Sequence, residues 1–129
     1  MDLQQHLRRQ MAFSKATFGP GDRLSGVTDH MSKELIEVKE AGDPREWVDL
    51  VLLSLDGLWR SLAYDGQDPY IATYTSGSKK GLENNWDNIP EIMTMLIQEK
   101  QSKNEQRTWP DWRGADPTKA IEHDRSNES

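Results

Sequence analysis

The stretch KELIEVKEAGDPREWVDLVLLSLDGLWRSL, residues 33–62, decides the fold, because two helical patterns meet in it at Gly42-Asp43-Pro44. Gly42 is well placed to end the first helix. Asp43 fits the N-cap of a second helix, with Pro44 at its first position and Glu46 completing a capping box. A connection this short makes the two helices antiparallel neighbours. We therefore predict a helical hairpin, with helices at about 28–41 and from 44 to about 62.

The second helix of this hairpin is apolar around much of its circumference. A surface helix carries an apolar stripe on one side only, so this one belongs in the middle of a bundle or in a subunit interface. Its apolar residues are Trp47, Val48, Leu50, Val51, Leu52, Leu53, Leu55 and Leu58.

The rest of the chain adds helices at both ends of the hairpin. Apolar residues recur at helical intervals over residues 2–16 and again from Pro90. Residues 64–88 are rich in Gly, Ser, Asp and Asn, which predicts a long polar loop or insert. We predict an all-α bundle of about four to five helices over residues 1–113, followed by a polar, flexible tail at 114–129.

Composition excludes several classes of function. The chain has no cysteine, so disulfides, thiolate zinc sites and thiol nucleophiles are ruled out. A formal net charge of -6 argues against general nucleic-acid binding, which usually needs a basic surface. No secretory h-region and no run of 18 apolar residues occur, which favours a cytoplasmic protein without membrane contact.

Four acidic residues flank the hairpin turn. Glu34 and Glu37 lie three apart on one helix, and Glu46 and Asp49 repeat the spacing on the next. Like charges packed together repel, so a cluster of these carboxylates needs protons or divalent cations, and Mg²⁺ prefers oxygen ligands. The spacing also fits solvated acids and a capping role for Glu46, while Asp56 is a further candidate on the same stripe.

A basic segment follows the last apolar helix in KQSKNEQRTWPDWR, residues 100–113. Lys100, Asn104 and Arg107 share one helical face, which suits phosphate oxygens and a sugar hydroxyl. The same cations would also complement the dipole at a helix C-terminus. Trp109 can stack on a base or pin the C-terminal segment onto the core, and Gly57 beside Trp59 leaves room for a close helix or a ligand. We predict both tryptophans as aromatic contacts of a substrate.

These motifs, in this order, resemble the MazG-like all-α nucleotide pyrophosphohydrolases. Within them the resemblance is to the phage and bacterial dATP/dGTP pyrophosphohydrolases, a branch that includes the MazZ enzymes of phages that replace adenine by 2-aminoadenine. The family carries EExxE followed by ExxD, and Glu34, Glu37, Glu46 and Asp49 match its second to fifth acids. Lys33 stands at the first acid, and residues 100–107 match a KxxxNxxR signature.

The resemblance implies hydrolysis of dGTP and/or dATP to the monophosphate and pyrophosphate. It implies that the four acids hold two or more Mg²⁺ ions, with Mn²⁺ as a substitute, and that Glu34 or Glu37 accepts the proton of the attacking water. Lys100, Asn104 and Arg107 would contact phosphate and sugar. The resemblance also implies a homodimer or homotetramer in the cytoplasm, the host's if phage-encoded. The competing hypothesis is a catalytically silent helical oligomerisation module.

Overall fold

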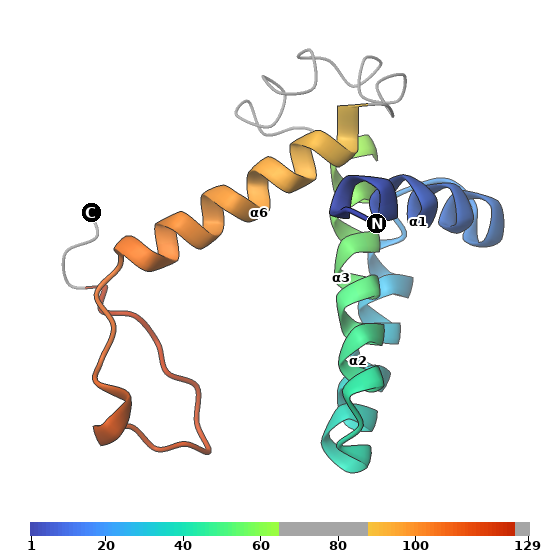
Figure 1. Cartoon of the computed structure of the whole chain (residues 1–129). Helices are drawn as coiled ribbons and strands as arrows, with labels where there is room; N and C mark the ends of the chain where they lie inside the picture. The colour runs from blue at the N-terminus through green and yellow to red at the C-terminus, as the bar shows by residue number, and fades with distance from the viewer. Residues whose placement is uncertain (65–87, 126–129) are drawn as a thin grey trace. The chain divides into compact units, whose positions relative to one another are not determined.

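The computed structural model describes residues 1–64 and 88–125, and within these ranges the chain is helical without a β-strand. This result confirms the all-α prediction. The helices are α1 (Leu3–Phe18), α2 (Leu24–Ala41), α3 (Pro44–Tyr64) and α6 (Ile89–Gln106), followed by a 3₁₀ turn at Trp112–Gly114 (Figure 1). No helix in the described ranges has the length and apolar character needed to cross a membrane.

The main difference from the expected boundaries is at the start of α2, which begins at Leu24 rather than near residue 28. Arg23 precedes it in the left-handed conformation, with φ 49°. The predicted polar loop at 64–88 falls outside the described residues apart from its two ends, Tyr64 in α3 and Asn88.

The helical hairpin forms as predicted, with α2 and α3 running antiparallel side by side (Figure 1). Gly42 ends α2 at φ 65°, and its N–H donates to the carbonyl oxygen of Val38 at 3.3 Å. Asp43 caps α3, because its Oδ1 accepts the backbone N–H of Arg45 at 2.9 Å. Among the described residues no bond returns from the Asp43 backbone N–H to the Glu46 carboxyl, so the second half of the capping box is not formed.

The chain divides into two compact units, Met1–Thr94 and Met95–Ser129, and each is described by itself. In the first unit, α1 lies across α3, where Gln10 Nε2 donates to the carbonyl oxygen of Leu52 at 2.7 Å. Side chains from α1, α2, α3 and the first turn of α6 form its core: Leu7, Met11, Val27, Val38, Trp59, Leu62, Ala63, Ile89, Ile92 and Met93.

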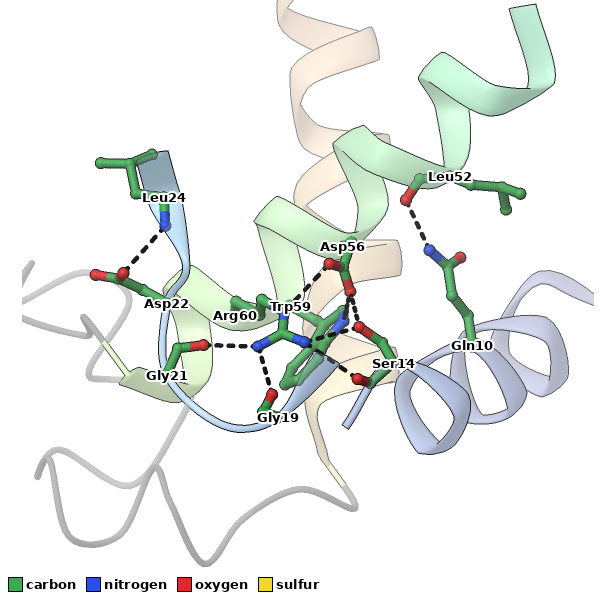
Figure 2. Close-up of polar contacts among 10 residues, drawn as sticks. All are labelled: Gln10, Ser14, Gly19, Gly21, Asp22, Leu24, Leu52, Asp56, Trp59 and Arg60. Atoms are coloured by element: carbon green, nitrogen blue, oxygen red, sulfur yellow. Dashed lines mark hydrogen bonds and ion pairs between the residues drawn. The ribbon is translucent and has the colours of Figure 1, made fainter. Parts of the chain in front are cut away.

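A buried polar network fastens α3 to α1 and to the turn that follows α1 (Figure 2). Arg60 is fully buried, and its Nε donates to Asp56 Oδ2 at 3.1 Å. Its other nitrogens donate to the carbonyl oxygens of Gly19 and Gly21, at 2.9 and 2.8 Å, and to Ser14 Oγ at 2.8 Å. Because these partners come from three segments, Arg60 sets the path of residues 19–23 over α3.

The second unit contains the last three turns of α6 and the segment after it. Residues 115–125 return toward the end of α6: Asp124 N–H donates to the carbonyl oxygen of Thr108 at 2.7 Å, and the rings of Trp109 and His123 lie 5.5 Å apart. The domain boundary at residue 113 and the flexibility of the tail remain predictions.

Candidate active site

Three of the four predicted acids converge where α2 ends and α3 begins. One carboxylate oxygen from each of Glu34, Glu46 and Asp49 lies within 4.8 Å of the others. The antiparallel packing of the hairpin brings them together, because Glu34 sits two turns before the Gly42 break and the other two lie in the first turns of α3. Residues 12 and 15 positions apart in sequence thus share one site.

Glu34 is the most enclosed of these acids, with 14% of its side chain exposed. Its Oε1 lies 3.3 Å from Nε2 of His30, one turn earlier on α2. Its Oε2 is buried and has no hydrogen-bond partner among the described residues. A buried carboxylate oxygen without a donor is costly, so this atom points to a ligand that the protein itself does not supply.

The electrostatics of the cluster agree with this geometry. Burial raises the pKa of Glu34 above its usual value, and the Glu37 hydrogen bond and the charges of Glu37 and Asp49 raise it further, against an opposing effect of His30. Burial also raises the pKa of Glu46, together with the charges of Glu37, Asp49 and Glu34. The charged form of each acid is therefore penalised unless a cation is bound.

Glu37 lies beside the converging group rather than in it. Its side chain is exposed, and it lies close enough to Glu34 and Glu46 to raise the pKa of both. Carboxylates this close to one another repel unless one of them holds a proton or a cation lies between them. Glu37 thus lies beside the cluster, but it is not one of the three residues whose oxygens converge.

The donor set fits a hard divalent cation. Carboxylate oxygens from two helices, one of them buried and without a partner, are the ligands that Mg²⁺ takes in proteins, with water in the remaining positions. Asp56 is not one of these ligands, because its carboxylate belongs to the buried polar network of Arg60. Its Oδ1 accepts Ser14 Oγ at 2.5 Å and Trp59 Nε1 at 2.7 Å, and Arg60 occupies Oδ2.

The predicted phosphate-binding residues lie in the second unit, where two of them, Asn104 and Arg107, contact each other. Arg107 Nη1 donates to the side-chain oxygen of Asn104 at 3.0 Å, and Trp109 Nε1 donates to the Asn104 carbonyl oxygen at 2.6 Å. Lys100, one turn earlier on α6, is exposed. The structure thus joins Asn104, Arg107 and Trp109 into one cluster, and their substrate contacts remain proposals.

Trp59 requires a correction. Only 1% of it is exposed, its indole N–H is used by Asp56, and the Arg60 guanidinium lies 4.6 Å from its ring centroid. A base cannot stack on a ring that the core already covers. Trp59 therefore packs the core, and the prediction that it contacts substrate is not supported by this structure.

Sequence reasoning missed residues that line a cavity beside Glu34 and Asp49, among them Phe13, Phe18 and Arg23. The signal was present in TFGPGDR, residues 17–23, where an aromatic and a cation flank a glycine-rich turn. A turn alone explains a segment of this composition, so the sequence offers no reason to link these residues to the acids. Only their position in the structure identifies them as candidates for the site.

The fold and the cluster define an all-α protein with a carboxylate site suited to a divalent cation. A model of the dATP/dGTP pyrophosphohydrolase family matches residues 6–87. The match covers more than half of the chain and includes all four acids, so the chain belongs to the dATP/dGTP pyrophosphohydrolase family, a family of enzymes. No match was found among the curated proteins or among the solved structures.

Proposed function

We propose that this protein hydrolyses dGTP and/or dATP to the monophosphate and pyrophosphate in a reaction that requires two or more Mg²⁺ ions, with Mn²⁺ as a substitute. The observation that carries the proposal is the convergence of Glu34, Glu46 and Asp49 within 4.8 Å in a chain of this family. Bound divalent cations supply a water of lowered pKa and neutralise triphosphate charge.

The positions of the four acids suggest different roles for them in metal binding and in proton transfer. Glu34, Glu46 and Asp49 hold the cations, because their oxygens converge and Glu34 Oε2 lacks another partner. Glu37 accepts the proton of the attacking water, since it borders the cluster and coordination does not require it. The water oxygen then bonds to the α-phosphorus while the bond from that phosphorus to the αβ-bridging oxygen breaks, which releases pyrophosphate.

The residues on α6 serve the phosphates and the sugar of the substrate. Lys100 and Arg107 neutralise charge on the departing pyrophosphate, and Asn104 contacts the sugar. Trp109 remains a candidate for stacking, because 43% of it is exposed.

We further propose that the enzyme is a cytoplasmic homodimer or homotetramer that acts on the deoxynucleotide pool, as in MazZ-like synthesis of 2-aminoadenine DNA in phages. Support for self-association comes from exposed apolar side chains on the hairpin, which are otherwise unfavourable in water. Ile36, Trp47 and Val51 are 56%, 59% and 54% exposed.

A product-resolved substrate screen tests the proposal. The protein is incubated with each dNTP and NTP and Mg²⁺, and monophosphate, pyrophosphate and inorganic phosphate are quantified separately. We expect dGMP or dAMP with equimolar pyrophosphate, and loss of turnover in chelator that Mg²⁺ or Mn²⁺ restores. Inorganic phosphate as the first product would place the cleavage at another bond, and no turnover of any nucleotide by the folded protein would refute the enzyme assignment.

A further inference from the structure

A cavity of about 290 Å³ opens directly beside the acidic cluster, in the first unit of the chain. Its wall comes from α1, the turn after α1, the start of α2 and the middle of α3, and includes Glu34 and Asp49. The volume is near the lower end of the range for small-molecule sites. A ligand whose phosphates lie at the acids can therefore place its remaining part in this cavity.

The wall away from the acids is mainly apolar and aromatic. Phe13 and Phe18 are 61% and 49% exposed, and their rings meet edge to face with centroids 6.2 Å apart. Leu52 and Leu53 complete this side. Exposed aromatic rings at a cavity mouth offer a flat surface to a nucleobase, and stacking on such a ring does not depend on which base is bound.

Arg23 is the cation of this wall, and its backbone is held in an unusual conformation. It is the one non-glycine residue with positive φ in the described part of the chain. Residues other than glycine adopt this conformation mainly where their surroundings impose it. Its guanidinium carbon lies 5.3 Å from the Phe18 ring centroid. A Cβ added at Gly26 would meet its Nη2 at 3.0 Å, so the small residue leaves room for the guanidinium.

The other polar side chains of the wall are already engaged. Gln10 bonds to Leu52 and His6, and Asp56 bonds to Ser14, Trp59 and Arg60. His30 faces Glu34. Arg23 has no salt bridge among the described residues, so its donors are available to a ligand.

We propose that this cavity is the nucleoside subsite and that Arg23 recognises guanine by donating to N7 and O6 of the base. This inference rests on the proposed function. Guanine presents two acceptors on this edge, which match the paired donors of a guanidinium, whereas adenine presents one acceptor and one donor. Arginine has no acceptor for the adenine amino group. The site therefore favours dGTP over dATP.

The test compares Arg23→Gln with wild type on dGTP, 7-deaza-dGTP and dATP, with pyrophosphate release as the readout. Arg9→Gln, an exposed arginine on α1 outside the cavity, is the matched control. We expect wild type to prefer dGTP and Arg23→Gln to lose about 5- to 150-fold in kcat/KM for dGTP, the worth of one bidentate base contact. Turnover of dATP should stay at or above the wild-type level, because a Gln side chain can bond the N6 and N7 of adenine.

The analogue 7-deaza-dGTP tests the same contact from the side of the substrate, so that the enzyme change and the substrate change form a double-mutant-type cycle. Because 7-deaza-dGTP lacks the N7 acceptor, wild type should handle it poorly and Arg23→Gln should lower it much less than it lowers dGTP. Equal losses for dGTP and dATP would show that Arg23 binds phosphate, and no loss for either would show that it binds no substrate; both results overturn the proposal.

Two further outcomes are separable. Circular dichroism and thermal melting report whether Arg23→Gln folds. If it does not fold, the wild-type enzyme alone tests the N7 contact. Undiminished turnover of 7-deaza-dGTP by wild type would then overturn the proposal. Absence of pyrophosphate from every dNTP with wild type would overturn the proposed function and the subsite with it. Equal losses in the variant overturn the subsite alone.

Discussion

At the residue scale, the acidic cluster sets function against stability. Glu34 and Glu46 have pKa values above their usual value because they are half-buried beside like charges. A carboxyl group with a raised pKa binds protons more tightly in the folded than in the unfolded state. Its contribution to stability is therefore complete below about pH 4.5, the value of a free Glu, and is lost as the pH rises through the folded pKa.

Substitution of Glu46 by Gln should remove part of this penalty. In chelator, we expect Glu46→Gln to melt at a higher temperature than wild type, by a margin that grows from pH 4.5 to pH 8. The lowered pKa values of Asp43 and Asp116 act in the opposite sense but are common to both proteins, so they cancel in the difference.

Thermal melting by circular dichroism across this pH range measures the effect, and added Mg²⁺ should reverse the order by binding the wild type better. A margin that is constant with pH would show that Glu46 is not under strain from its neighbours.

Asp49 carries a sharper functional prediction. Asp49→Asn keeps the shape of a converging ligand but removes its charge, so we expect at least the 10- to 100-fold loss that is typical when even an outer partner of a metal site is removed. Pyrophosphate release at several Mg²⁺ concentrations measures it.

Glu40→Gln is the matched control, because Glu40 is exposed on the same hairpin and lies outside the converging group. Equal activity of Asp49→Asn and Glu40→Gln would remove Asp49 from the site.

At the element scale, the position of α1 and of residues 19–23 depends on Arg60. It joins Asp56 on its own helix to Ser14, Gly19 and Gly21, and none of its surface is exposed. A buried ion pair is a weak source of net stability, but the removal of one member leaves the other charge without a partner.

We expect Arg60→Met to lower the free energy of unfolding by about 3–5 kcal/mol. Arg45→Met is the control, because the side chain of Arg45 is 89% exposed and its pair with Asp43 should be worth about 1 kcal/mol or less. Urea denaturation compares the two variants. Equal stabilities would mean that the network only accompanies the packing of α1 on α3.

At the scale of the whole molecule, the apolar surface of the hairpin is larger than a single copy of the described chain covers. The exposed fractions lie between 47% and 59% for Leu35, Ile36, Trp47, Val48 and Val51. A second copy is the occupant that the proposed oligomer supplies.

We expect light scattering to give at least twice the chain mass of 14.8 kDa for wild type. Val51→Lys should shift the mass to that of one chain, because a buried, unpaired ammonium would oppose association. Ile121→Lys is the control, since Ile121 lies in the second unit and is 41% exposed. Unchanged masses for both variants would place the interface elsewhere.

The sequence by itself determined the helices, the hairpin turn and the family. Periodicity and the Gly42-Asp43 pair are local signals, and local signals survive without knowledge of the fold. The acid spacing predicted a cluster because residues three apart on a helix share a side whatever the helix packs against. The family match rests on the same ordered motifs.

Only the tertiary structure decided which acids converge, what Asp56 and Trp59 do, and where a cavity opens. The oxygen of Glu34 without a partner, the use of Asp56 by Arg60 and the place of Arg23 beside the acids depend on contacts between residues far apart in sequence. Side-chain spacing within one helix carries no information about such contacts, because burial and partners are set by how the helices pack.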